Sequence, residues 1–229
     1  HAMLLDARAK TGLLNENPVS EDMAEAAKMV RVDFALNVVI NSKHELVKAF
    51  SGDLDQVFSE GVKLVDEMYR VQMDRRADIV VVSPGGNPAD LNLFQAYKAV
   101  DNALEAVKRG GVIVLVAELP EGHGNQDFYD WMVKFKDLKA MESEVKRNFV
   151  MGGAKAYYYT KALQKAQIIL VSSMPDYYAA TVFKLKTARA VNDALNQALT
   201  VAGKNAKVWT MPYGNYTLPE VRAVAEEGH

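Results

Sequence analysis

The chain contains no cysteine among its 229 residues, and this absence removes several kinds of chemistry at once. Disulfide bonds, thiolate nucleophiles, zinc sites built on cysteine and iron–sulfur clusters are all excluded. Histidine is scarce too: His1 and His229 are terminal, His44 lies in a polar turn, and His123 stands between two glycines. A histidine between glycines is most often an exposed residue at a loop tip. We therefore expect His1, His44 and His229 to be bystanders and His123, the only histidine of further interest, to be such a surface residue, and no motif supports a complete metal site or catalytic set.

Long apolar runs and an excess of one charge are also missing. No stretch reaches the roughly 18 apolar residues that a membrane helix needs, and no signal peptide opens the chain. A formal net charge of −2 leaves no basic surface for nucleic acid or an anionic membrane. The hydrophobic share of 49% and the charged share of 24% are those of an ordinary globular protein. We expect a soluble, cytoplasmic protein with neither nucleic acid nor a membrane as partner.

The most informative stretch is Asp78–Pro88, in which a β-branched run meets a turn rich in proline and glycine. Such a run is typical of a strand buried on both faces of a parallel sheet. Asp90 is a candidate N-cap for a helix that runs to about Arg109, where Gly110-Gly111 ends it. A second buried strand, Val112–Ala117, follows directly. This pattern predicts a βαβ unit.

Helices and strands alternate along the rest of the chain. Before the central stretch we expect a helix capped by Ser20, Glu21 or Asp22, a strand at 32–40 and an amphipathic helix at 53–70. After it we expect helices at 127–135, 139–148 and 152–167, strands at 168–172 and 206–211, and a long helix from Ala179 or Phe183 to Ala202. The alternation predicts an α/β fold with a mainly parallel sheet flanked by helices, a Rossmann-like three-layer arrangement. The charged run that starts at Asp74 indicates a domain boundary, which gives domains 1–73 and 74–229.

Four segments follow the carboxyl ends of the predicted strands, where ligands collect in parallel sheets. They should lie along one edge of the sheet: Ser83–Asp90, Glu118–Asn125, Ser172–Asp176 and Met211–Tyr216. The turn Gly85–Pro88 has neither the dinucleotide-binding nor the phosphate-loop spacing, which weakens the case for a NAD-type oxidoreductase. An anion site at this turn and a purely structural turn both remain open. No nucleophile elbow supports a hydrolase triad.

The helix after this turn presents two different faces. Gln95, Lys98 and Asn102 fall on the side opposite an apolar face that we expect to lie on the sheet. A solvated surface is the usual explanation for such polar residues. The alternative is that Gln95 and Lys98, one turn apart near the helix start, face a ligand and attract an anion together with the helix dipole. Periodicity does not decide between them. The apolar face comprises Leu93, Tyr97, Val100, Leu104 and Val107.

The run Ser83–Ala103, followed by Gly110–Glu118, resembles the C-terminal domain of nickel-pincer lactate racemases. Ala7–Val19 and Met211–Gly214 are also similar to that family. The resemblance spans most of the chain, and its central motif is long. It implies that residues 1–73 are the tail of the family's upstream catalytic domain and that 74–229 form its C-terminal α/β domain.

The resemblance also implies a chemistry. In the family, a 2-hydroxy acid is racemised by hydride transfer to and from a nickel-pincer nucleotide, nickel pyridinium-3,5-bisthiocarboxylate mononucleotide. The paired histidines, the tether lysine and the nickel-ligand histidine belong upstream. Gln95 and Lys98 match family residues that contact the cofactor or the substrate. Phe94 stands where the family often has tyrosine, which removes one hydrogen bond and leaves the particular 2-hydroxy acid open.

The resemblance thus implies the C-terminal part of a nickel-pincer-dependent 2-hydroxy-acid racemase or epimerase, an isomerase domain that closes over cofactor and substrate. Its expected partners are the upstream catalytic domain and a small 2-hydroxy acid. The chain opens with His1-Ala2-Met3, so either residues were added or it begins inside a longer protein, as the resemblance implies. The fragment alone should be inactive and hold no cofactor. The alternative is a non-catalytic α/β module that binds a small anion or a partner protein.

Overall fold

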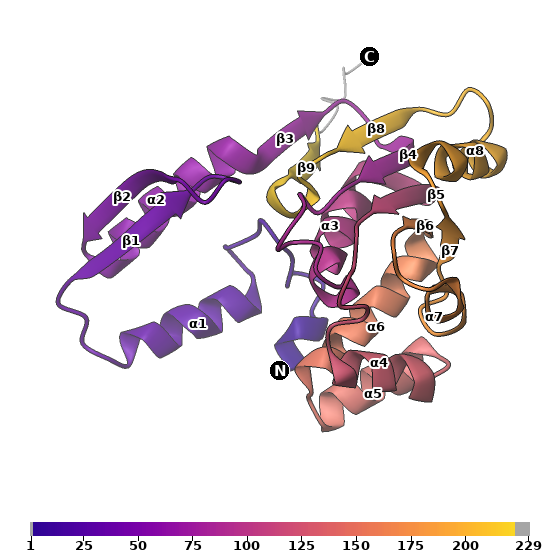
Figure 1. Cartoon of the computed structure of the whole chain (residues 1–229). Coiled ribbons are helices and arrows are strands. Elements are labelled where there is room, and N and C mark those ends of the chain that lie inside the picture. Colours follow the sequence, from indigo (N-terminus) through magenta and orange to yellow (C-terminus); the bar gives the residue numbers. More distant parts are fainter. Residues whose placement is uncertain (1, 223–229) are drawn as a thin grey trace, which may run out of the picture. The chain divides into compact units, whose positions relative to one another are not determined.

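The structure is a computed structural model that describes residues 2–222 (Figure 1). The chain divides between Arg70 and Val71 into two compact units. His1 and His229, both expected to be bystanders, lie outside the described residues.

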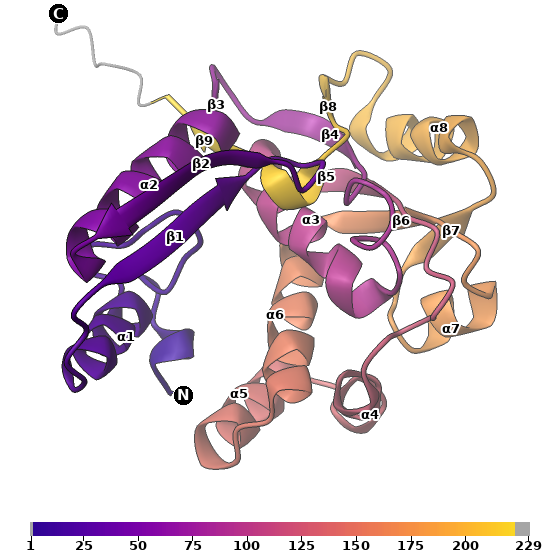
Figure 2. The ribbon, with the colours of Figure 1, turned by 60° about the vertical axis from the view of Figure 1, so that its left-hand side comes forward.

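The first unit is a β-hairpin with a helix along it, visible in Figure 2. The two strands pair antiparallel, and the Tyr69 hydroxyl donates to the Ile40 carbonyl at 2.9 Å, which ties the end of the helix to the hairpin. The second strand, which the sequence did not predict, mixes apolar and polar residues without alternation. In order, the elements are η1 (Ala2–Leu5), α1 (Pro18–Lys28), β1 (Ala35–Ile40), β2 (Leu46–Gly52) and α2 (Leu54–Tyr69).

The helix α1 begins earlier than predicted, because Asn17 and not Ser20, Glu21 or Asp22 caps it. The Asn17 side chain accepts hydrogen bonds from the amides of residues 19 and 20. Pro18 occupies the first turn, where its missing amide proton costs nothing.

The second unit carries a five-stranded sheet in the order β7-β6-β5-β4-β8, and every neighbouring pair is parallel. The prediction that the strands near 78–83, 112–117, 168–172 and 206–211 share one parallel sheet is confirmed, and so is the α/β fold class. Two short strands, β3 and β9, form a separate pair. In order, the elements are β3 (Arg70–Met73), β4 (Ala77–Val82), α3 (Leu93–Ala106), β5 (Val107–Val116), α4 (Gln126–Lys134), α5 (Leu138–Arg147), α6 (Met151–Lys165), β6 (Gln167–Val171), α7 (Asp176–Thr181), β7 (Lys186–Ala188), α8 (Val191–Ala202), β8 (Val208–Met211), η2 (Gly214–Tyr216) and β9 (Leu218–Val221).

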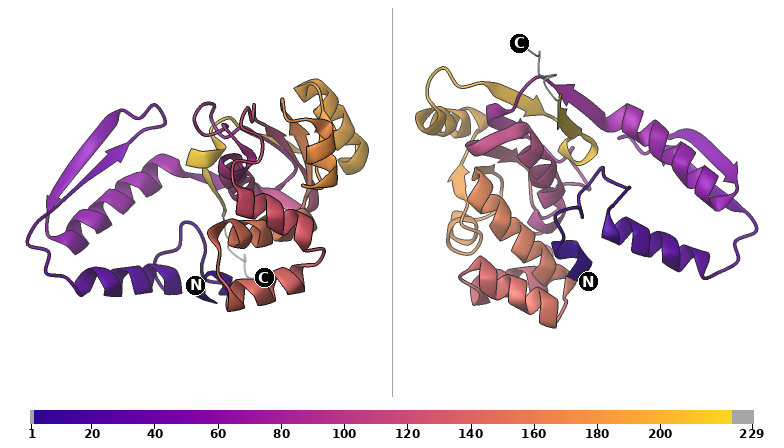
Figure 3. Two further views of the ribbon diagram at one scale, coloured as in Figure 1. Left: turned by 60° about the horizontal axis from the view of Figure 1, so that its bottom comes forward. Right: turned by 180° about the vertical axis from the view of Figure 1, so that it is seen from behind.

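Helices cover both faces of this sheet (Figures 1 and 3). On one face, Ile79 and Ile169 pack with Ala194 and Ala198 of α8. On the other face, α3 and α6 contact the central strands. Ile79 and its neighbour Val80, which point to opposite faces, are both 0% exposed. The β-branched run of β4 is therefore buried on both sides, as its composition predicted.

The predicted long helix ending at Ala202 is wrong. Instead, α7 ends at Thr181, and β7 joins the sheet beside β6 before α8 begins. Phe183 is fully buried, stacks on Phe128 at 5.2 Å between ring centroids, and receives the Tyr159 hydroxyl on its carbonyl at 2.8 Å. These tertiary contacts hold the backbone out of helical geometry, which helical spacing alone does not reveal.

Candidate functional site

The turn after β4 is shaped by glycine. Gly85 and Gly86 have φ values of +117° and +81°, a backbone region that residues with a Cβ rarely adopt. The Gly85 amide donates to Ser83 Oγ at 3.3 Å, and the Gly214 amide from η2 donates to the Ser83 carbonyl at 2.7 Å. The Gly85 amide and the Ser83 carbonyl are therefore already bonded within the protein, which favours the structural turn over an anion site at these two groups.

The amino end of α3 is likewise closed by protein. Asn92, 8% exposed, caps the helix with Oδ1 on the Gln95 amide at 3.0 Å, so the expected cap at Asp90 is wrong. The loop after β5 supplies two further acceptors: the carbonyls of Gly122 and His123 bind the amides of Leu93 and Phe94 at 2.9 and 3.2 Å. The helix amides are thus occupied, and side chains, not the helix end, are left to meet an anion.

Those side chains are Gln95 and Lys98. Both are exposed on α3, and within residues 2–222 neither side chain makes a hydrogen bond or an ion pair. Asn102, predicted on the same side, instead donates to the Gly214 carbonyl at 2.8 Å and so fixes η2 against α3. The opposite side of the helix is buried on the sheet as predicted. The helix end is earlier than expected, at Ala106, because Val107 already pairs with β4 in the sheet.

A third polar group reaches this surface from a different helix. Lys155 of α6 donates from Nζ to the Phe94 carbonyl at 2.5 Å, and its ammonium lies 4.0 Å from the centroid of the Phe94 ring. Burial and then the nearby charge of Lys98 lower the pKa of Lys155 to about 8, while Asp101 acts in the opposite direction. Sequence reasoning missed Lys155, since nothing in its own segment links it to α3.

The other candidate residues near the carboxyl ends of the strands already make contacts within the protein. His123 Nδ1 lies 3.2 Å from the Asn125 carbonyl, and the His123 ring packs 5.0 Å from that of Tyr129. Glu121 accepts from Asn92 Nδ2 at 2.9 Å. Across residues 2–222, no group of three or more histidine and acidic side chains could hold a metal ion. The described part of the chain therefore presents cationic and amide groups here, but no metal centre.

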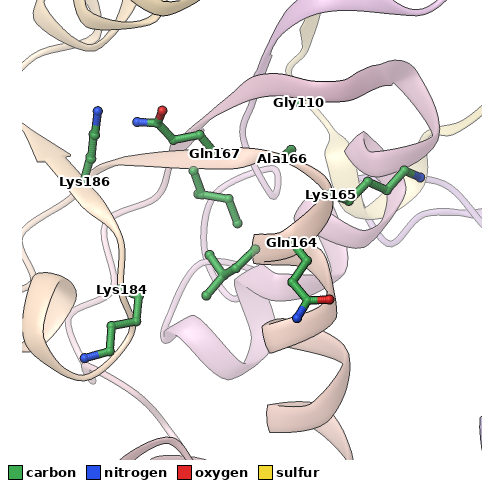
Figure 4. A pocket seen from close by; sticks show the side chains of 9 residues that line it. Gly110, Gln164, Lys165, Ala166, Gln167, Lys184 and Lys186 are labelled. Carbon is green, nitrogen blue, oxygen red and sulfur yellow. The ribbon is translucent and has the colours of Figure 1, made fainter. Parts of the chain in front are cut away.

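A hollow of about 450 Å³ lies elsewhere, where β6 begins, at the opposite end of the strands from α3's first turn (Figure 4). Its lysines do not converge. Lys165 pairs with Glu105 at 3.3 Å, and Lys184 donates to the Thr181 carbonyl. Figure 4 shows Lys165, Lys184 and Lys186 extending away from one another. We therefore place the candidate site at α3 and not in this hollow.

These features define a parallel α/β unit without a dinucleotide phosphate loop, whose first long helix offers unpaired polar side chains. Residues 72–217 match the family described as the lactate racemase C-terminal domain. The chain is 32% identical over 210 residues to the lactate racemase of Thermoanaerobacterium thermosaccharolyticum and 28% identical over 211 residues to that of Lactiplantibacillus plantarum. This chain belongs to the lactate racemase C-terminal domain family, and the resemblance to that domain seen in its sequence is confirmed.

The fold supports the same assignment. The lactate racemase apoprotein of Thermoanaerobacterium thermosaccharolyticum matches with a TM-score of 0.88 and 32% identity over 96% of this chain and 53% of that one. A Thermotoga maritima protein, with a TM-score of 0.66 and 15% identity over 90% of this chain and 54% of its own, shares the fold alone. The two sequence matches each cover 90% of this chain but only 49% and 50% of the two racemases. The chain thus spans about half the length of these relatives. No helix within residues 2–222 is long and apolar enough to cross a membrane.

Proposed function

We propose that this chain is the C-terminal part of a nickel-pincer-nucleotide-dependent racemase or epimerase of a lactate-type 2-hydroxy acid, and that it closes over cofactor and substrate. The observation that carries the proposal is the pair Gln95 and Lys98, exposed and unpaired on α3 in the described structure. Their chemistry suits a small 2-hydroxy acid, which has one carboxylate and one hydroxyl. The lactate racemase relatives give the reaction class.

The cofactor fits this chain only in part. Its nickel has no ligand set within residues 2–222, so the metal would have to be held by groups outside the described chain. Its anionic oxygens, by contrast, suit an ammonium and a carboxamide on one helix face. We therefore assign Lys98 and Gln95 to contacts with the nucleotide or the substrate. When bound, the cofactor supplies the hydride chemistry of the racemisation.

The two side chains would bind different kinds of ligand group, one charged and one neutral. The Lys98 ammonium would bind a carboxylate or phosphate oxygen, and this contact strengthens once water is excluded. The Gln95 amide would orient a neutral group such as a hydroxyl. Both side chains are assigned to binding, and the Gln95 amide cannot take up a proton because it does not ionise. Within our proposal, proton transfer therefore belongs to a base on the upstream domain.

The first unit supports the proposed upstream partner. Every second residue of β1 from Leu36 is apolar and exposed: Leu36 at 69%, Val38 at 49% and Ile40 at 41%. A two-stranded hairpin with an apolar face is only marginally stable alone and usually adds to a larger sheet or core. We propose that the upstream catalytic domain covers this face, so that residues 1–73 are its tail.

The test is nickel analysis and a lactate racemase assay of the full-length protein after cofactor loading, beside the same measurements on the 229-residue chain. We expect bound nickel and racemase activity in the full-length protein and neither in the chain alone. Activity that is absent in the loaded full-length protein, with L- and D-lactate and other 2-hydroxy acids as substrates, would contradict the proposal and favour a non-catalytic anion-binding module.

A further inference from the structure

Lys155 is held in an unusual place for a lysine. Its side chain crosses from α6 to the first turn of α3, where Nζ donates to the Phe94 carbonyl at 2.5 Å. The ammonium lies 4.0 Å from the Phe94 ring centroid and 5.6 Å from that of Tyr97. These contacts hold the stem in one place and leave it partly buried. An ammonium has three donors, so two remain after the bond to the carbonyl.

The backbone beneath Lys155 is fixed as well. A Cβ added to Gly152 would lie 2.2 Å from Asn125 Oδ1, and one added to Gly153 would lie 2.2 Å from Trp131 Cε2. The first turn of α6 therefore packs directly on α4, with no room for a side chain between them. Lys155 follows directly after this turn, and a charged side chain whose backbone and stem are held beforehand loses little freedom when it binds a ligand.

Within residues 2–222, Lys155 has no ion-pair partner. Phe94 and Lys98 are four residues apart and share one side of α3, so Lys155 and Lys98 face the same surface. The charge of Lys98 acts on Lys155 as a repulsion, which Asp101 opposes. In the described part of the chain, no carboxylate forms an ion pair with either lysine, and the phenol of Tyr97 donates to Asp101 at 3.4 Å. Two lysines from different helices thus lie on one side of α3 and repel each other, and no carboxylate within residues 2–222 forms an ion pair with either.

We propose that Lys155 is a further anion-binding residue of this site, and that it holds one carboxylate or phosphate group together with Lys98. This inference rests on the proposed function, because it assigns a second contact to the group that Lys98 meets. An oxyanion between the two lysines would attract both ammonium groups, which offsets the repulsion between them, and it would accept hydrogen bonds from the two free N–H groups of Lys155. The same oxyanion chemistry occurs in the carboxylate of a 2-hydroxy acid and in the phosphate of a nucleotide. Lys155 acts by binding and not by chemistry.

The test is a titration of the 229-residue chain, labelled with ¹³C at the lysine side chains and followed by NMR. Sodium L-lactate and sodium phosphate are added in separate series at pH 7, with sodium chloride keeping the ionic strength constant. The variants are Lys98→Met and Lys155→Met, which keep the apolar stem, the double variant, and Lys155→Arg, which keeps the charge. The matched control is Lys161→Met, because Lys161 is an exposed lysine of the same helix.

We expect a saturable shift of the Lys155 resonance and a rise of its pKa above about 8 when the anion is bound. Each single methionine variant should weaken binding at least about tenfold, the range for a hydrogen bond to a charged group. The second substitution should add less than the first, because both lysines hold one anion. Lys161→Met should bind like the wild type. Saturation by lactate and not phosphate assigns the carboxylate, and the reverse assigns the phosphate.

Three results overturn the inference. One is a wild-type chain whose Lys155 resonance responds to neither anion beyond the chloride series. Another is unchanged affinity in Lys155→Met while Lys98→Met loses binding, which leaves the proposed function standing. The third is unchanged affinity in Lys98→Met, which removes the role proposed for Lys98 as well. If Lys155→Met loses its amide dispersion, Lys155→Arg decides: retained binding with a folded spectrum supports the inference, and lost binding overturns it.

Discussion

Replacement of Lys98 by alanine in the full-length protein tests whether Lys98 binds an anion or is only a solvated surface residue. Lys98 is exposed and makes no ion pair within residues 2–222, so its loss should change the free energy of unfolding by no more than about 0.5 kcal/mol. Removal of its charge also relieves the repulsion on Lys155, which favours the folded protein. Stability should therefore stay level or rise slightly.

Catalysis should respond very differently if Lys98 binds an anion. Removal of one partner of a charged contact that is shielded from water leaves the other unpaired, at a cost of about 2–4 kcal/mol. This cost corresponds to a fall in kcat/KM of about 30- to 900-fold. Gln95→Ala should cost less, about 0.5–1.5 kcal/mol, because a neutral hydrogen bond is lost. Lys98→Arg should restore only part of the activity, since a planar guanidinium does not reproduce a compact ammonium.

The assay is racemisation of lactate by the cofactor-loaded full-length protein, with melting temperature measured on the same preparations. Lys161→Ala serves as the control for a lost surface lysine on the same unit. Wild-type turnover in Lys98→Ala would refute the reasoning, because the exposed face of α3 would then be merely solvated. A large fall in melting temperature would refute it in another way, by showing that Lys98 supports the fold.

Two further predictions concern stability. Gly153→Ala should lower the free energy of unfolding by about 1–3 kcal/mol in urea denaturation, because its Cβ would lie 2.2 Å from Trp131 Cε2. Gly61→Ala is the control: a Cβ at Gly61 meets nothing within 4 Å, so this variant should be more stable than the wild type, and equal effects of the two substitutions would contradict the packing argument. The hydrogen bond from Lys108 lowers the pKa of Asp78 below its usual 3.8, so the ionised carboxylate stabilises the fold above pH 3.8 and this contribution is lost as the pH falls through the lower folded-state pKa. Thermal melts from pH 6 to pH 2 should show a flatter acid limb for Asp78→Asn than for the wild type, and identical limbs would rule this contribution out.

Local sequence was sufficient where one residue type dominates a stretch. The β-branched run that became β4 has no partly polar face, so it can only be buried on both sides, and this forces helices onto both faces of the sheet. The same logic located β5 and β6. Local sequence did not identify the N-caps of α1 and α3, because several residues that can cap a helix stand within a few positions of one another there. Asn17 and Asn92 became the caps because their side chains reach the free amides, a matter of backbone geometry and not of residue type.

The sequence by itself determined the α/β class, the family and the two polar side chains Gln95 and Lys98 on the exposed side of α3. Periodicity places residues on a helix face because neighbours along one helix are fixed by its geometry. Only the tertiary structure decided what surrounds that face. It closed the amino end of α3 with the carbonyls of Gly122 and His123, and it brought Lys155 from α6 to the Phe94 carbonyl. Contacts between distant segments depend on how helices pack on the sheet, and no local pattern encodes that packing.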